Sequence, residues 1–335
     1  MNLTFAILLV ILGGTLLVVG GELLVRGASH LAALLAIPPV VVGLTIVAAG
    51  TSAPELAVSL MSCFRPDGGA DMALGNVVGS GICNILLILG LPALICPLTV
   101  TSTLIKREMP LMICVSLLLW GVIGLSTYNM GHVLPQWSGL VFVALFIAYC
   151  TWTIREVRKN ENKNLADSME TSYAATKRGF WPVLRALLFF VVGLGLLIFG
   201  SSRFIDGAVF LAGYMGVSKL VIGLTVLAVG TSLPELVVSV ISAVRGRPDM
   251  AIGNVVGSNI FNILIVLGVS ASFVPKGIPV SHQAFCFDIP VMVATAVLGT
   301  YLCATGKVLK RWEGLVLLVC YVDYLTCLAF YGGML

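Results

Sequence analysis

The sequence contains the same six-residue pattern twice, and each copy lies in a long apolar stretch. The run Gly-Thr-Ser-Ala-Pro-Glu at residues 50–55 returns as Gly-Thr-Ser-Leu-Pro-Glu at residues 230–235. A carboxylate at membrane depth is unfavourable by several kcal/mol on an order-of-magnitude scale, so its presence indicates a functional site. The duplication therefore predicts a chain of two related halves, each of which supplies one acidic residue.

Composition places those halves in a membrane. Of the 335 residues, 59% are hydrophobic and 10% are charged, whereas a soluble domain carries about 25% charged residues. A membrane-spanning helix needs roughly 17–25 apolar residues. Ten runs reach that length, over residues 3–27, 38–63, 71–96, 108–126, 134–153, 181–201, 219–244, 249–274, 287–305 and 312–333. The first run has no basic start and no small-residue cleavage site, so we expect a retained helix.

The two halves correspond along most of their length. Gly-Asn-Val-Val-Gly-Ser stands at residues 75–80 and again, letter for letter, at residues 253–258. An odd number of spans per half makes the second half enter the membrane from the opposite side. We therefore predict an all-α membrane protein with ten transmembrane helices in two inverted-topology five-helix repeats. The repeats are expected over residues 1–153 and 181–335, with the duplicated motifs at 43–90 and 223–268.

Lysine and arginine residues predict the orientation of the chain. If the N-terminus is outside, thirteen of them fall in cytoplasmic loops and four in outer loops, with Arg26 and Arg185 left out because they lie within helix ends. Positive charge favours the cytoplasmic side. We expect a multi-pass protein of the cytoplasmic (inner) membrane with both termini outside and a short, poorly ordered cytoplasmic linker at residues 154–180. The net charge of +4 reflects this bias, so no nucleic-acid partner is expected, and no protein partner is predicted.

The acidic motif offers several oxygen atoms on one helix face. Thr51 and Ser52 lie four and three positions before Glu55, so the three side chains face one way. Pro54 cannot donate to the carbonyl four residues back, which frees the Gly50 carbonyl and breaks the helix. Non-helical backbone at this depth is tolerated only where protein or a water-filled cavity supplies partners. The second copy repeats the whole arrangement.

A companion segment in each half adds further oxygens. Ser80 and Asn84 lie four positions apart, as do Ser258 and Asn262, and each pair follows a glycine run that lets helices approach closely. Carboxylates, hydroxyls and carbonyls suit a hard cation such as Ca²⁺ or Na⁺. No His or Cys is repeated in the two copies, which argues against a softer metal. We expect no resident cofactor, with the ions as cargo.

Through these two duplicated motifs the chain resembles the Ca²⁺/cation antiporter superfamily. It is similar to the bacterial sodium/calcium exchanger members of that superfamily along nearly its whole length. The resemblance implies ten helices, a central site between the second, third, seventh and eighth, and alternating access driven by sliding of the first and sixth.

The resemblance also implies a ligand set. Ca²⁺ would be held by Glu55 and Glu235 with the carbonyls of Thr51 and Thr231, and Asn84 would line the middle of the site. The implied Na⁺ ligands are the carbonyls of Ala48 and Ala228 and the side chains of Thr51, Ser52, Ser80, Thr231, Ser232 and Ser258. Asn262 stands where related sodium/calcium and potassium-dependent exchangers often have an aspartate, which leaves stoichiometry and potassium dependence open. Gly81 and Cys83 also differ from their counterparts Asn259 and Phe261.

Charge alone predicts an exchanger rather than an enzyme. The two glutamates together carry a charge of about −2. One Ca²⁺ ion neutralises this charge, whereas two or three Na⁺ ions are needed to do the same. Because Ca²⁺ and Na⁺ would bind the same carboxylates, the two kinds of ion cannot be bound at the same time. An empty site would expose this charge to apolar surroundings, which is unfavourable. Only a site filled with ions would therefore change from facing one side of the membrane to facing the other. The sequence therefore predicts Na⁺/Ca²⁺ antiport by alternating access that normally extrudes Ca²⁺.

Other functions stay open at this point. A buried glutamate can carry a proton, so antiport of protons for Ca²⁺ or another divalent cation is the alternative. An intramembrane hydrolase using Ser52 or Ser80 would need a base, and no His or Lys lies at membrane depth beside them. Asp323, deep in the last apolar run, is expected to bond a neighbouring helix or to serve as a peripheral ion ligand.

Overall fold

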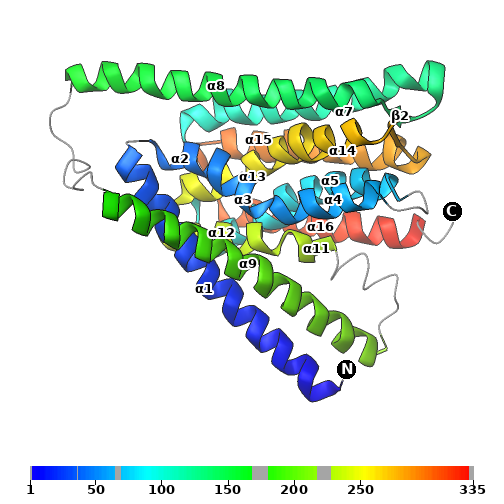
Figure 1. Ribbon diagram of the computed structural model, residues 1–335, viewed down its shortest axis with the longest axis horizontal. Helices are drawn as coiled ribbons and strands as arrows, with labels where there is room; N and C mark the ends of the chain where they lie inside the picture. Colours follow the sequence, from blue (N-terminus) through cyan, green and yellow to red (C-terminus); the bar gives the residue numbers. More distant parts are fainter. Residues whose placement is uncertain (1, 36, 65–68, 168–179, 217–227, 332–335) are drawn as a thin grey trace.

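The computed structural model describes residues 2–35, 37–64, 69–167, 180–216 and 228–331, and these residues are almost entirely helical (Figure 1). Within these ranges, eight helices are long and apolar enough to cross a membrane, and the pair Pro39–Thr51 and Ala53–Cys63, bent by 43°, makes a ninth. The remaining predicted span, 219–244, is described only from residue 228 onwards. The described residues therefore agree with the predicted ten-helix bundle.

The elements follow one another in a similar order in the two halves. The first half consists of α1 (Leu3–Leu35), α2 (Pro39–Val42), η1 (Gly43–Val47), α3 (Ala48–Thr51), α4 (Ala53–Cys63), α5 (Asp71–Cys83), η2 (Asn84–Ile88), α6 (Gly90–Ile95), β1 (Leu98–Thr99), η3 (Leu104–Glu108), α7 (Met109–Met130), β2 (Val133–Leu134) and α8 (Gln136–Asp167). The second half consists of α9 (Phe180–Tyr214), α11 (Ala228–Thr231), α12 (Leu233–Val244), α13 (Pro248–Phe261), η5 (Asn262–Leu267), α14 (Gly268–Phe273), β3 (Ile278–Pro279), η6 (Ala284–Asp288), α15 (Ile289–Ala304), β4 (Val308–Leu309) and α16 (Arg311–Tyr331). The η elements are π-helical turns.

Helices α1 and α9 are longer than predicted. They contain 33 and 35 residues, so each measures about 50 Å at a rise of 1.5 Å per residue. The apolar runs predicted over residues 3–27 and 181–201 therefore end before the helices do. The carboxylate of Glu22 accepts from Arg26 at 2.6 Å and from Arg245 at 2.8 Å. Together the two helices cross the rest of the bundle obliquely (Figure 1).

Glycines let α1 and α9 approach closely. A Cβ atom on Gly20 would lie 2.8 Å from the Gly193 carbonyl oxygen, and one on Gly193 would lie 2.7 Å from the Gly20 carbonyl oxygen. Gly13, seven residues before Gly20, and Gly200, seven residues after Gly193, meet in the same way. Only glycine fits at these crossings, because each backbone occupies the space that a side chain would need.

Two short antiparallel strand pairs join the halves. Strand β1 pairs with β4, and β2 pairs with β3. Because α7 runs from the β1 side of the bundle to the β2 side, the two pairs lie at opposite ends. In the duplicated sequence β1 corresponds to β3 and β2 to β4, so each pair crosses from one repeat to the other. This exchange agrees with an inverted repeat, in which equivalent segments lie on opposite sides of the membrane.

Helix α8 continues to Asp167, so the range 154–180 expected as a linker begins as helix. Residues 168–179 of that range lie outside the described part of the chain. Helices α5 and α13 occupy the centre of the bundle, and every residue of α13 from Met250 to Phe261 is buried. Polar side chains on these two helices therefore lie inside the protein.

Candidate ion-binding site

Both copies of the acidic motif break their helix at the serine. Ser52 (φ −85°, ψ 8°) separates α3 from α4, and Ser232 (φ −92°, ψ 10°) separates α11 from α12. The following prolines fall in the first turn of the new helix, where a backbone N–H would have no helical partner anyway. The predicted break is thus present in both halves. In the second half Ser201 Oγ donates to the Gly230 carbonyl oxygen at 2.9 Å.

The two glutamates are fully buried and lie in one site. Ser52 Oγ of the first repeat donates to Glu235 Oε1 at 2.8 Å, and Ser232 Oγ of the second donates to Glu55 Oε1 at 3.3 Å. Glu55 and Glu235 are each 0% exposed. Such an exchange of hydrogen bonds requires the two motifs to face each other across the repeat boundary.

The companion helices reach the same site. Asn262 Nδ2 donates to Ser80 Oγ at 2.8 Å, and Asn84 Nδ2 donates to Asn259 Oδ1 at 2.9 Å. Asn84 and Asn262 each open a π-helical turn, η2 and η5. Such turns often accompany functional sites. The sequence did not predict them.

Five side-chain oxygens of the site accept no hydrogen bond from the described residues. They are Glu55 Oε2, Glu235 Oε2, Asn84 Oδ1, Asn262 Oδ1 and Ser258 Oγ. Leaving a buried polar atom unpaired is unfavourable by about 1–3 kcal/mol. All five are oxygens and two are carboxylate oxygens, which are the ligand atoms that hard cations prefer. Among the described residues no cluster of three or more His, Cys, Asp or Glu side chains offers a different metal site.

Two asparagines that the sequence reasoning had not singled out hold the broken helices in place. Asn76 Nδ2 donates to the backbone carbonyl of Glu55 at 3.3 Å and to Ser59 Oγ at 2.9 Å. Asn254 does the same for Glu235 and Ser239, at 3.3 and 3.1 Å. The sequence does indicate their importance, because this asparagine and its serine partner occur at corresponding positions in both halves.

The remaining predicted ligands lie around the breaks. Buried Thr51 donates to the Ala48 carbonyl oxygen and to Asn254 Oδ1, both at 3.3 Å. Thr231 is half-buried, and Ala228 is the first residue of α11.

The predicted close approach at the glycine runs holds for Gly253 and Gly257 of the second repeat and, less tightly, for Gly81 of the first, where a Cβ atom would lie 3.1 Å from Met292 Sδ. A Cβ atom on Gly253 or Gly257 would lie 2.8 or 2.4 Å from a backbone carbonyl oxygen, of Val40 and of Leu44 respectively. A Cβ atom on Gly75 or Gly79 meets no described atom within 4 Å, because these glycines line a cavity.

The predicted bond from Asp323 to a neighbouring helix is not found. Its side chain is exposed on α16, and no hydrogen bond or ion pair joins it to another described residue.

Comparison with known proteins gives consistent similarities. The sodium/calcium exchanger protein family matches residues 5–155 and 185–330. The chain is 33% identical over 351 residues to the sodium/calcium exchanger MaX1 of Methanosarcina acetivorans, covering 97% of this chain and 99% of that protein. It is 36% identical over 296 residues to the inner membrane protein YrbG of Escherichia coli K12, covering 88% and 87%. The structure of the sodium-calcium exchanger NCX_Mj soaked with zero Na⁺ and Ca²⁺ is similar, with a TM-score of 0.79, 30% identity and coverage of 98% and 100%.

Proposed function

Because the chain belongs to the sodium/calcium exchanger family, we propose that it exchanges Na⁺ for Ca²⁺ through the site between α3–α4, α5, α11–α12 and α13. The observation that supports this most is the buried pair Glu55 and Glu235, bonded across the repeats by Ser232 and Ser52, with one oxygen of each carboxylate left over.

Ca²⁺ binds between the two carboxylates, because one divalent ion balances their charge. The ligands are Glu55 and Glu235 with the carbonyls of Thr51 and Thr231. Na⁺ ions spread over the surrounding oxygens instead, and the shared carboxylates prevent both loads from binding together. The proposed Na⁺ and lining residues are Ala48, Ala228, Thr51, Ser52, Ser80, Asn84, Thr231, Ser232, Ser258 and Asn262.

The direction follows from charge and potential. Three Na⁺ exchanged for one Ca²⁺ move one net positive charge, and a membrane potential contributes roughly 2.3 kcal/mol per charge per 100 mV. An inside-negative potential then drives Na⁺ in and Ca²⁺ out. We place the protein in the cytoplasmic membrane with both termini outside, by the distribution of Lys and Arg. Alternating access arises from movement of α1 and α9, the pair that crosses the central helices.

The test is uptake of radiolabelled Ca²⁺ into Na⁺-loaded proteoliposomes diluted into Na⁺-free buffer. Glu55→Gln and Glu235→Gln keep the shape of the side chain and remove its charge, so each should lower uptake at least about 100-fold, as expected for loss of a charged ligand. Glu156→Gln makes the same chemical change at a partly exposed ion pair with Arg107 and should transport normally.

Uptake that follows a pH gradient and ignores Na⁺ would identify a proton/Ca²⁺ antiporter instead. Undiminished transport in both Gln variants would reject the site.

A further inference from the structure

A second carboxylate is duplicated outside the central site. Glu108 ends η3 just before α7, and Asp288 ends η6 just before α15. Each accepts a hydrogen bond from a tyrosine on the last helix of its repeat. Tyr149 donates to Glu108 Oε2 at 2.8 Å, and Tyr324 donates to Asp288 Oδ1 at 3.3 Å. The two repeats thus contain the same carboxylate and tyrosine pair.

In the first repeat the protein itself neutralises this carboxylate. Arg107 Nε lies 2.7 Å from Glu108 Oε1, and the Glu108 side chain is 1% exposed. Arg107 also pairs with Glu156 at 3.0 Å and lies 4.3 Å from the centroid of the Trp152 ring. Buried Glu108 therefore has a guanidinium directly beside it, and the second carboxylate on that guanidinium, Glu156, is partly exposed.

In the second repeat the arginine is absent. Phe287 stands at the position of Arg107. Among the described residues, no Lys, Arg or His forms an ion pair with Asp288. Asp288 is half-buried and lies about one turn inside the end of the membrane span Ala284–Ala304. A carboxylate in such surroundings is unfavourable unless a cation balances it.

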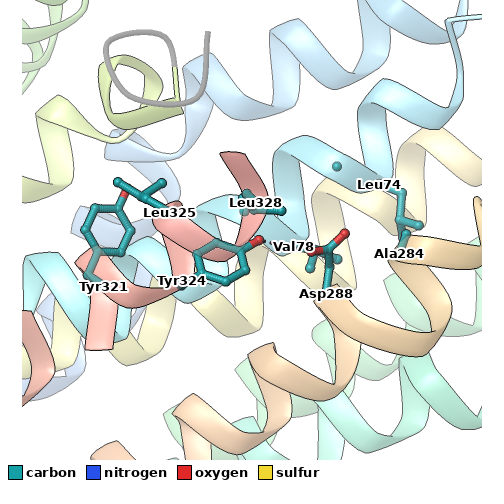
Figure 2. A pocket seen from close by; sticks show the side chains of 10 residues that line it. Leu74, Val78, Ala284, Asp288, Tyr321, Tyr324, Leu325 and Leu328 are labelled. Atoms are coloured by element: carbon teal, nitrogen blue, oxygen red, sulfur yellow. Dashed lines mark hydrogen bonds between the residues drawn. The ribbon is translucent and has the colours of Figure 1, made fainter. Parts of the chain in front are cut away.

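Asp288 faces a cavity of about 230 Å³ between α5, η6 and α16 (Figure 2). Asp288 and Tyr324 point toward each other, and Tyr321 lies one turn back on α16 (Figure 2). The other walls are mostly apolar, with Leu74, Val78, Leu325 and Leu328 among them. The cavity thus combines one negative charge and two phenol groups with hydrocarbon surroundings.

Tyr321 has a different neighbour from its counterpart in the first repeat. The rings of Phe146, on α8 of the first repeat, and Phe261, on α13 of the second, pack with centroids 5.6 Å apart. Their counterparts across the repeats are Tyr321 and Cys83. The Tyr321 hydroxyl and the Cys83 thiol are hydrogen-bonded, so a polar pair takes the place of two packed rings.

The charge of the cavity selects the cation. One Na⁺ balances the single carboxylate, whereas Ca²⁺ would leave an excess positive charge among apolar side chains. A water molecule occupies about 30 Å³ of liquid, so the cavity has room for an ion that keeps several waters. Oxygen ligands from the carboxylate, a hydroxyl and these waters suit a hard monovalent ion.

We propose that the Asp288 cavity is a second Na⁺ site, separate from the central one, in which the Asp288 carboxylate and the Tyr324 hydroxyl hold one partly hydrated Na⁺. This site does not depend on Glu55 or Glu235. It exists in only one repeat, because Arg107 occupies the equivalent place in the other.

The experiment measures equilibrium binding of radiolabelled Na⁺ to the purified full-length chain carrying Glu55→Gln and Glu235→Gln. Saturable binding should persist in this background, and adding Asp288→Asn should weaken it at least tenfold. Adding Phe287→Arg, which copies the first repeat, should have the same effect although the carboxylate remains. Asp206→Asn removes an exposed carboxylate that pairs with Arg203 on α9 and should leave the binding unchanged.

Size-exclusion elution and the thermal midpoint establish that each variant is folded. If Asp288→Asn is not, Tyr324→Phe keeps the ring and should weaken Na⁺ binding several-fold. The proposal is overturned if Na⁺ binding in the background is absent, if it survives both Asp288→Asn and Phe287→Arg, or if the cavity takes up Ca²⁺ or protons but no Na⁺. Since the readout is binding and not transport, each of these results leaves the proposed exchange at Glu55 and Glu235 standing.

Discussion

Single residues of the central site act across the repeat boundary. Ser52 sits three positions before Glu55 in the chain, yet its hydroxyl bonds Glu235, and Ser232 mirrors it. A serine hydroxyl that donates to a carboxylate still has lone pairs for a cation. Each serine can therefore orient one glutamate and bind an ion at the same time.

Replacing Ser52 by alanine should raise the Na⁺ concentration needed for half-maximal Ca²⁺ uptake by about tenfold. A hydrogen bond to a charged group contributes about 1.5–3 kcal/mol, and the variant also loses a proposed ligand. Ser62→Ala is the matched control, because Ser62 is also buried but its hydroxyl donates to the Ser59 carbonyl oxygen instead of to a glutamate of the site. Similar Na⁺ curves for the two variants would contradict a role for Ser52 at the site.

Two kinds of element surround the site. Helices α3–α4 and α11–α12 are broken, and Asn76 and Asn254 hold their ends. Helices α1 and α9 are unbroken and touch through glycine backbones. The broken helices leave oxygen atoms free to bind an ion, whereas the unbroken pair packs against the rest of the bundle as two continuous helices.

Gly193→Leu should destabilise the protein, because a Cβ at this position already lies 2.7 Å from the Gly20 carbonyl oxygen. Overpacking of this kind is unfavourable by about 1–3 kcal/mol, which corresponds to a fall of roughly 2–8 °C in the thermal midpoint. Gly195→Leu, on the same helix with nothing within 4 Å of its Cβ position among the described atoms, should melt like the parent. An equal shift in both variants would mean that helix propensity, rather than the α1–α9 contact, dominates.

At the scale of the whole molecule, the inverted repeat places two acidic residues from distant segments in one buried site. The strand pairs β1–β4 and β2–β3 join the repeats at both ends of the bundle. Neither half forms the site alone, since each glutamate is bonded by a serine of the other half. The net charge that the proposed transport cycle moves across the membrane therefore depends on both halves of the chain.

If three Na⁺ leave a vesicle for each Ca²⁺ that enters, one positive charge moves outward per cycle. An inside-positive potential of about 60 mV then adds about 1.4 kcal/mol, or about tenfold, to the Ca²⁺ accumulation ratio at equilibrium. The ratio can be measured in proteoliposomes clamped by K⁺ and valinomycin at several potentials. A ratio that does not change with potential would indicate two Na⁺ per Ca²⁺.

Local chemistry made part of this protein predictable. Apolar runs indicated where spans lie, Pro54 and Pro234 indicated where two of them break, and the duplicated motifs indicated that Glu55 and Glu235 would meet. Each of these inferences depends on hydrophobicity, backbone chemistry or a repeat that is visible along the chain. The lengths of α1 and α9 were underestimated, because both helices continue beyond the apolar runs from which the spans were predicted.

By itself, then, the sequence determined the membrane class, the two repeats and the residues that could bind a cation. Only the tertiary structure decided that Asn84 would bond Asn259, that Ser52 would bond Glu235 rather than the glutamate of its own motif, and that Gly75 and Gly79 would line a cavity. The physical reason is that an apolar run or a helix break depends on residues that are neighbours in the chain. The partner of a buried polar group is set by packing between segments more than a hundred residues apart.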